Sequence, residues 1–219
     1  MKDKSGIYPK VENHNYMKII CIARNYAAHA KELNNPLPEK PVIFLKPESS
    51  LIIKNKPFFI PDWSTKMDYE TELVYKIGKV GKYIDEKFAL SYISEVTLGI
   101  DFTERDLQGE LKSKGLPWEL SKSFDGSAVI GHFLDPATLK NGKDIEFRME
   151  KNGTTVQHAH SSKMIFSMAK IISYVSRYFT LKTGDLIFSG TPEGVGSVSI
   201  GDRLTGFIED KEMFSFNIK

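Results

Sequence analysis

The chain has 219 residues, of which 41% are hydrophobic and 26% are charged, and its formal net charge is +2. These values are ordinary for a globular protein with one large domain, and so small a charge argues against a nucleic-acid partner. The longest apolar runs, such as KIICIA and AKIISYV, are too short to span a bilayer, so no membrane partner is expected either.

Residues 1–16 are polar and precede Met17, where the apolar pattern begins. They have neither the hydrophobic core of a secretory signal nor the Arg-rich, acid-poor composition of an organelle presequence. We therefore expect a cytoplasmic protein with a polar N-terminal extension over residues 1–16 and a single domain over residues 17–219. The only cysteine, Cys21, excludes an intramolecular disulfide and is expected to be a small core residue.

The first part of the domain alternates short strands with one helix. A buried strand is predicted at residues 19–23, and the good helix formers of residues 25–34 predict a helix that ends at a Pro-rich segment. Residues 41–46 read as a second strand, and residues 50–60 as extended structure with a turn.

In residues 67–79, acidic and apolar side chains alternate with the period of a β-strand. Residues 96–101 read as the next strand. Thr103 is expected to cap a helix over residues 104–114 that stops at Gly115.

Asn152–Gly153 lies between two strand-like flanks and predicts a hairpin over residues 145–157. Apolar residues at helical spacing predict a helix within residues 161–179, behind a Ser cap, and residues 184–190 and 201–209 read as strands. Because short strands outnumber helices without regular alternation, the pattern favours a β-rich α+β domain.

Three acids, Asp68, Glu70 and Glu72, share one face of the strand predicted at residues 67–79. Neighbouring carboxylates there lie roughly 7 Å apart and repel unless they are protonated, separated by solvent or bridged by a cation. Asp101, at the end of another predicted strand, could complete a cluster. A solvated acidic face is the commoner meaning of such a pattern, and spacing does not choose between the pairs Asp68/Glu70 and Glu70/Glu72.

The kind of cation follows from the donors. Because no Cys or His pair has zinc-like spacing, Mg²⁺, Mn²⁺ or Ca²⁺ fits the acids better than Zn²⁺.

His29 and Glu32 lie three residues apart on one face of the first predicted helix. A carboxylate beside an imidazole orients the ring and raises its basicity, as in a general base, although a surface charge pair is commoner. The helix has few large apolar residues, which suits a mobile lid.

Two further segments suit an anion. The glycines of residues 189–197 can bring backbone amides close to a bound anion, although no Lys follows at the P-loop position. Lys122 lies among small polar residues and could contact an anionic substrate. A plain turn and a solvent-exposed lysine are the ordinary alternatives.

Taken together and in order, seven segments closely resemble the fumarylacetoacetate hydrolase superfamily, and within it the short acylpyruvate hydrolases that also decarboxylate oxaloacetate. The segments are CIARNYAAHAKEL, PVIFLKP, DYETELVYKIG, GIDFTERDLQ, KGLPWELSKSFDG, SSKMIFSMAKIISYVS and GDLIFSGTPEGVG. The resemblance runs from about Met17 to the C-terminus. It implies a mixed β-roll with a few peripheral helices, a homodimer, and a Mg²⁺ or Mn²⁺ ion, with Ca²⁺ as a substitute.

The resemblance also implies roles for individual residues. The metal ligands fall on Glu70, Glu72 and Asp101, the His–Glu dyad of a segment that closes over substrate on His29 and Glu32, and the family lysine on Lys122. The substrate-binding positions fall on Arg24, Asn25, Arg105, Gln108 and Thr191.

The implied reaction is hydrolysis of the carbon–carbon bond of 2,4-dioxo acids such as acetylpyruvate or fumarylpyruvate, with oxaloacetate decarboxylation through the same enolate. In this hypothesis the cation chelates the substrate's 1-carboxylate and 2-oxo group. His29, oriented by Glu32, activates water, and Lys122 helps to stabilise the enolate.

Two other readings stay open. Relatives isomerise dienoates or tautomerise 2-oxo acids with the same site, so an isomerase or oxaloacetate tautomerase is an alternative enzyme. A cation-binding structural module is the non-enzymatic alternative.

Overall fold

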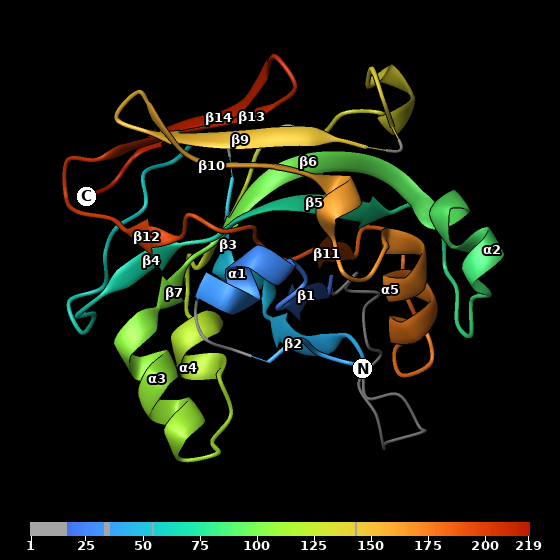
Figure 1. Cartoon of the computed structure of the whole chain (residues 1–219), viewed down its shortest axis with the longest axis horizontal. Helices are drawn as coiled ribbons and strands as arrows, with labels where there is room; N and C mark the ends of the chain where they lie inside the picture. The colour runs from blue at the N-terminus through green and yellow to red at the C-terminus, as the bar shows by residue number, and fades with distance from the viewer. Residues whose placement is uncertain (1–16, 33–35, 54, 143) are drawn as a thin grey trace, which may run out of the picture.

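The computed structural model describes residues 17–32, 36–53, 55–142 and 144–219, so the predicted extension over residues 1–16 lies outside it. The fold is α+β and rich in strands, in the mixed β-roll arrangement that the resemblance implied. A large, curled mixed sheet faces a second sheet of four antiparallel strands, and short helices lie around them (Figure 1).

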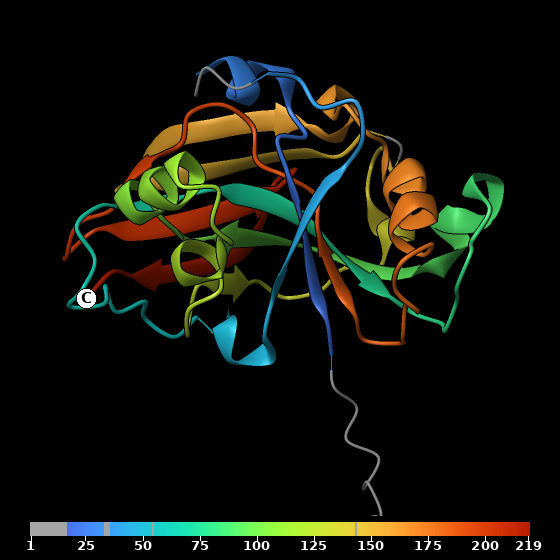
Figure 2. The same ribbon diagram turned by 90° about the horizontal axis from the view of Figure 1, so that it is seen from below.

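The large sheet has seven strands and mixes parallel and antiparallel pairs. In spatial order they are β2 (Val42–Lys46), β1 (Ile19–Ala23), β11 (Leu186–Phe188), β5 (Thr71–Ile77), β6 (Ile93–Asp101), β8 (Ala128–Ile130) and β3 (Leu51–Ile52). Figure 2 shows β1 and β2 crossing the molecule side by side, with α1 (Ala27–Glu32) beyond the end of β1.

The second sheet has the order β10 (Thr154–His160), β9 (Glu146–Lys151), β13 (Arg203–Ile208) and β14 (Lys211–Asn217). The predicted hairpin is confirmed, because Asn152 and Gly153 join β9 to β10 with φ values of 54° and 80°. A small third sheet consists of β12 (Gly196–Ser197), β4 (Met67–Tyr69) and β7 (Thr103–Glu104).

The main core lies between the two larger sheets. It includes Leu73 of β5, Leu98 of β6, Phe147 of β9 and Phe214 of β14, all 1% exposed or less. The opposite face of the large sheet carries a smaller apolar cluster, in which Cys21 is fully buried and unpaired, as expected for a small core residue.

The predicted strand over residues 67–79 is two strands, β4 and β5, which meet at Glu70. β4 pairs with β12 and β7 of the small sheet, whereas β5 pairs with β11 and β6 of the large one. The acidic stretch is therefore the place where the chain passes from one sheet to the other.

The helix caps and boundaries correct two predictions. α3 spans Arg105–Ser113, and its cap is Glu104, whose carboxylate accepts from the Leu107 amide at 2.6 Å; Thr103 instead belongs to β7. Gly115 follows α3 with φ +65°, in keeping with the predicted stop.

The apolar run within residues 161–179 yields only α5, Met168–Val175, capped by Ser167. Met164 and Ile165 do not extend this helix, because their backbones pair with Tyr26 and Asn25 beside α1. Tertiary pairing thus overrides the helical periodicity there. The remaining helices are α2 (Glu86–Ala89) and α4 (Glu119–Lys122), and among the described residues no helix is long and apolar enough to cross a bilayer.

Candidate active site

Three carboxylates converge where the small sheet meets the seven-stranded sheet. Glu70 joins β4 to β5, Glu72 lies on β5, and Asp101 is the last residue of β6. The Asp101 amide donates to the Glu70 carbonyl at 2.8 Å. Each offers a carboxylate oxygen within 4.8 Å of the others, and each is at most 6% exposed. The solvated-face interpretation of the acidic strand is therefore wrong, because water does not surround these charges.

Lys122 supplies positive charge to two of the three acids. Its ammonium lies 2.7 Å from Glu70 Oε2 and 2.6 Å from Asp101 Oδ2, and it donates to Thr103 Oγ1 at 2.6 Å. Burial alone would lower the pKa of Lys122, but the charges of Asp101 and Glu70 outweigh it and raise that pKa. Lys122 is thus a buried, fully paired cation and not the solvent-exposed lysine of the ordinary alternative.

Arg105 binds the third predicted acid of the strand, Asp68, as well as Glu70. Its Nε lies 2.8 Å from Asp68 Oδ2 and its Nη2 lies 2.7 Å from Glu70 Oε1, while Nη1 donates to Gln108 Oε1 at 2.8 Å. Asp68 also accepts from Ser197 at 2.6 Å. Asp68 therefore orients Arg105 and is not one of the three clustered acids.

The surroundings shift the pKa values of Glu70 and Glu72 in opposite directions. Burial favours the neutral form of Glu70, but Lys122 and Arg105 outweigh it and hold the pKa of Glu70 well below its usual range. Burial, then the charges of Asp101 and Glu70, raise the pKa of Glu72 well above its usual range. The Gly190 amide, 2.7 Å from Glu72 Oε2, offsets only part of that rise.

His29 and Glu32 form the predicted pair on α1. His29 Nδ1 lies 3.2 Å from Glu32 Oε2, and Glu32 Oε1 accepts from the Gly194 amide at 3.1 Å. The loop after β11 therefore fixes Glu32, which in turn fixes the ring. The contact through Nδ1 leaves Nε2 as the ring nitrogen that His29, only 5% exposed, can offer to the cavity it lines.

A single cavity brings most of the predicted site residues together. Those that line it are Arg24, His29, Glu70, Glu72, Asp101, Arg105, Gln108, Lys122 and Thr191. Its free volume is about 30 Å³, roughly the space of one water molecule. A substrate can therefore enter only if α1 or the side chains that line the cavity move.

Asn25 does not line the cavity with the others. Its buried amide donates to the carbonyls of Ser189 and Phe166, at 2.8 and 3.1 Å, and accepts from the Phe166 amide at 2.8 Å. These bonds tie α1 to the loops that follow β10 and β11. These bonds give Asn25 a positioning role in the fold, and its predicted contact with substrate stays a prediction.

The loop over residues 189–197 is held against the acidic strand, as well as against α1. Thr191 Oγ1 donates to the Thr71 carbonyl at 3.0 Å and accepts from Gln157 Nε2 at 2.9 Å, while Gln157 Oε1 accepts from the Thr71 amide. Gln157 was not predicted, and its position in an ordinary strand gives no local signal.

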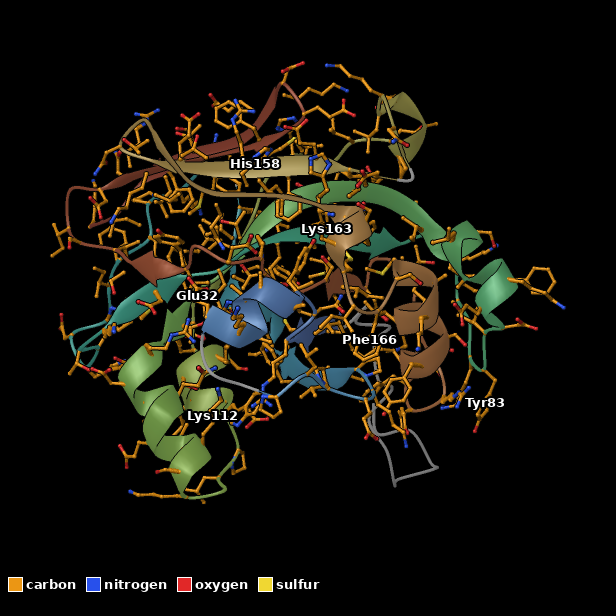
Figure 3. The ribbon with its side chains drawn as sticks, in the orientation of Figure 1. Glu32, Tyr83, Lys112, His158, Lys163 and Phe166 are labelled. Atoms are coloured by element: carbon orange, nitrogen blue, oxygen red, sulfur yellow. The ribbon has the colours of Figure 1, made fainter. Side chains whose placement is uncertain are left out.

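Two lysines at the site were also not predicted. Lys46, at the end of β2, is 2% exposed; its ammonium lies 2.8 Å from Asp101 Oδ1 and donates to the Lys122 carbonyl and to Ser127. Lys112 lines the cavity from α3, below α1 (Figure 3). Its spacing from Arg105 and Gln108, seven and four residues, places all three on one helical face and could have revealed it.

The acidic cluster fits a divalent cation. Its donors are carboxylate oxygens, which Mg²⁺ and Mn²⁺ prefer, and burial together with like charge disfavours three free carboxylates. Lys46, Lys122 and Arg105 neutralise part of that charge, but Glu72 lies opposite only the Gly190 amide. Glu70, Glu72 and Asp101 would hold the ion.

Curated relatives resemble the chain over almost its whole length. The mitochondrial oxaloacetate tautomerase fahd-1 of Caenorhabditis elegans is 38% identical over 202 residues, which cover 92% of this chain and 94% of the relative. The mitochondrial oxaloacetate decarboxylase of Dictyostelium discoideum is 42% identical over 185 residues, covering 84% and 85%.

A solved structure agrees in fold and sequence. Fumarylpyruvate hydrolase of Pseudomonas aeruginosa, in complex with Mn²⁺ and pyruvate, superposes with a TM-score of 0.87 at 34% identity, covering 95% of this chain and 93% of that one. The sequence profile described as fumarylacetoacetate (FAA) hydrolase C-terminal matches residues 18–219. The chain therefore belongs to the fumarylacetoacetate hydrolase family, and this family and its named relatives indicate an enzyme of the hydrolase, decarboxylase or isomerase type.

Proposed function

We propose that the protein hydrolyses the C3–C4 bond of acylpyruvates, 2,4-dioxo acids such as acetylpyruvate or fumarylpyruvate, and that it also decarboxylates oxaloacetate. The observation that carries this proposal is the His29–Glu32 pair on the same cavity as the buried acids and Lys122. A proton shift alone needs no activated water, whereas hydrolysis does.

The chain's own groups suit each stage of this reaction. His29 takes a proton from water, with Glu32 orienting the ring, and the resulting hydroxide adds to the distal carbonyl carbon. The C3–C4 bond then breaks, its electron pair forms the enolate of pyruvate, and a proton returned to C3 completes the reaction. We assign Lys122, which pairs with Glu70 and Asp101, to stabilising this negative charge, and a Mg²⁺ or Mn²⁺ ion on Glu70, Glu72 and Asp101 would supply Lewis-acid stabilisation.

Substrate anions would meet several cations at the cavity. Arg24, Arg105 and Lys112 line it together with Gln108. Arg24 has φ 58°, an unusual conformation for a residue other than glycine, which turns the chain at the end of β1. We assign Arg24, Arg105, Gln108 and the Thr191 loop to binding of the substrate carboxylates.

Oxaloacetate tautomerisation is the second candidate, favoured by the name of the relative from Caenorhabditis elegans. It would use the same carboxylate binding, with His29 moving a proton between carbon and solvent. Both reactions pass through an enolate, so the same Lys122 would serve either.

A substrate panel separates the candidates. Purified protein with Mg²⁺ or Mn²⁺ is given acetylpyruvate, fumarylpyruvate, oxaloacetate and a hydroxydienoate isomerase substrate. We expect metal-dependent turnover of acylpyruvates that is lost in His29→Ala and in Glu72→Ala. If only tautomerisation is seen, the second candidate is correct; if nothing turns over, a cation-binding module becomes the better description.

Two properties implied or expected at the outset complete the proposal. We propose a homodimer, tested by light scattering of the purified protein, and a cytoplasmic location, tested by cell fractionation. The relatives from Caenorhabditis elegans and Dictyostelium discoideum are named as mitochondrial proteins, so the fractionation includes a mitochondrial marker where the host cell has one.

A further inference from the structure

We propose a second metal site, suited to Zn²⁺, on the outer face of the four-stranded sheet, made by Glu146, His158 and His160. The nitrogen or carboxylate oxygen that each offers lies within 4.8 Å of the other two. The ligands come from β9 and β10, so the site is separate from the acidic cluster; Figure 3 labels His158 on this sheet, well apart from Glu32 and Lys112.

The sheet register brings the three side chains together. His158 and His160 are two residues apart on β10 and therefore point to the same face, opposite to buried Gln157. Glu146 of β9 is the Cα partner of His160, which places its carboxylate beside the imidazoles. His158 Nε2 lies 2.8 Å from Glu146 Oε1. The two histidines are spaced i and i+2, as on a strand, so the ligand spacings usual in zinc fingers do not reveal them.

One atom of the cluster needs a partner. His160 Nδ1 is shielded from solvent and has no hydrogen bond among the described residues; the nearest carboxylate oxygen, Asp144 Oδ2, is 3.5 Å away. This contact with Asp144 is too long for a good hydrogen bond, and a metal ion bound at the nitrogen would satisfy it more fully. Ligand atoms around a tetrahedral Zn²⁺ are about 3.4 Å apart, so modest side-chain rotations would close the cluster on an ion.

The donor set and the surroundings both select the cation. Two imidazoles and one carboxylate suit Zn²⁺, whereas Mg²⁺ prefers oxygen ligands alone. An adjacent cavity of about 220 Å³ gives room for water at the fourth position and is lined by four carboxylates, one lysine and His160. The carboxylates are those of Asp144, Glu146, Glu209 and Asp210.

Two cations near the cluster, among the described residues, have other partners. Lys140 pairs with Asp210, and Arg148 lies 3.6 Å from Glu150 and stacks on the Phe207 ring at 4.0 Å. Neither Lys140 nor Arg148 forms an ion pair with a proposed ligand. A bound ion would tie β9 to β10 next to Gln157, which holds the Thr71 and Thr191 segments of the active site.

Zinc titration calorimetry of untagged full-length protein tests the proposal, with excess Mg²⁺ present to occupy the acidic cluster. We expect one Zn²⁺ per chain, bound at least about tenfold more weakly in His158→Ala and in His160→Ala. His132→Ala is the matched control, because His132 contacts the Met213 carbonyl away from the cluster, and it should bind zinc as the wild type does.

Two further readouts fix the location and the consequence. Anomalous diffraction at the zinc edge should give a peak between Glu146, His158 and His160, and zinc should raise the melting temperature of the wild type but not of His158→Ala. Wild-type protein that binds no zinc in the presence of Mg²⁺ would overturn the proposal. So would histidine variants that bind zinc as tightly as the wild type.

Discussion

At the scale of single residues, the three buried acids of the active site differ in the partners that face them. Glu70 has Lys122 and Arg105, and Asp101 has Lys122 and Lys46, whereas Glu72 has only a backbone amide. This asymmetry explains why the pKa of Glu70 is lowered while that of Glu72 is raised. Glu72 is the acid that gains most from an added cation.

The residue that supports Glu72 is a glycine for two reasons. Gly190 has φ +96°, and a Cβ there would lie 2.7 Å from Asn25 Cβ and 3.0 Å from the Ile22 carbonyl. We expect Gly190→Ala to lower the free energy of unfolding by about 1–3 kcal/mol and to reduce metal-dependent turnover, since the amide would move away from Glu72. Urea denaturation and initial rates measure the two effects.

Gly109 is the matched control, because it lies inside α3 with no heavy atom within 4 Å of an added Cβ. Gly109→Ala should stabilise the protein by about 0.5–1 kcal/mol through helix propensity and leave turnover unchanged. Equal behaviour of the two variants would contradict the role given to Gly190.

Local patterns identified the acids and the His–Glu pair as candidates, but only the resemblance chose among Asp68, Glu70 and Glu72. In the structure Asp68 is not among the three acids whose oxygens converge, and Arg105 and Ser197 bind its carboxylate. Lys46 could not be predicted this way. A lysine at a strand end ordinarily reaches solvent, and its burial depends on Asp101, more than fifty residues away in sequence.

At the scale of elements, the acid Glu104 caps the start of α3, and the helix places the cations Arg105 and Lys112 at the cavity. Glu104 accepts from the Leu107 amide at its own helix end and from Thr65 and Lys66 across the small sheet. The sequence predicted a cap one residue earlier, at Thr103, because Thr is a favoured N-cap residue and Glu is not. Glu104 takes this role because the helix begins directly after it, at Arg105.

This cap makes stability depend on pH. Burial alone would raise the pKa of Glu104, but hydrogen bonds from Leu107, Lys66 and Thr65 outweigh it and lower the pKa from its ordinary value of 4.5. A carboxylate with a depressed pKa stabilises the folded state above that ordinary value, and the contribution is lost as the pH falls through the folded-state pKa.

We expect Glu104→Gln to cost about 1–2 kcal/mol of unfolding free energy at neutral pH, and the difference from the wild type to shrink below pH 4.5. Urea denaturation across a pH series measures it. Glu86→Gln, an exposed acid in the first turn of α2, is the control and should show little change at any pH. A Glu104→Gln difference that did not vary with pH would argue against a charged cap.

The cavity-facing side of α3 bears on substrate choice. Burial, then repulsion from Arg24 and Arg105, lowers the pKa of Lys112, which places it in a cationic field suited to a second substrate carboxylate. We therefore expect Lys112→Met to raise KM for oxaloacetate and fumarylpyruvate about tenfold, the effect of one charge-assisted hydrogen bond. Acetylpyruvate, which has one carboxylate, should be little affected.

Lys114→Met is the control for that comparison, because Lys114 lies just beyond the end of α3, half exposed, and pairs with Glu110 at 2.6 Å. It should alter no steady-state constant. An equal rise in KM for all three substrates in Lys112→Met would mean that Lys112 supports the site in general and does not bind the second carboxylate.

At the scale of the whole molecule, the site exists only in the assembled fold. Glu70 and Glu72 come from the transition between two sheets, Asp101 from the end of β6, and Lys122 from α4. Hydrophobic alternation predicted the strands and the β-rich class, but it does not encode which strand ends meet. Register and sheet order, which depend on long-range packing, bring these residues together.

Because the acids are packed inside the folded chain, a cation that binds them should stabilise the whole molecule. A ligand present at one hundred times its dissociation constant adds about 2.7 kcal/mol to the free energy of unfolding. We therefore expect Mg²⁺ or Mn²⁺ to raise the melting temperature of the wild type, and chelation to reverse the rise.

Glu72→Gln should separate the cost of burying the Glu72 charge from the benefit of that charge in binding a cation. It removes a carboxylate that burial and the charges of Asp101 and Glu70 disfavour, so the metal-free variant should be at least as stable as the metal-free wild type. It also removes a ligand, so Mg²⁺ should no longer raise its melting temperature. Thermal unfolding of both proteins, with Mg²⁺ and with chelator, gives all four values. An equal metal-induced rise in the two proteins would place the cation elsewhere, since a site that includes Glu72 cannot bind equally well after one of its three carboxylates has become neutral.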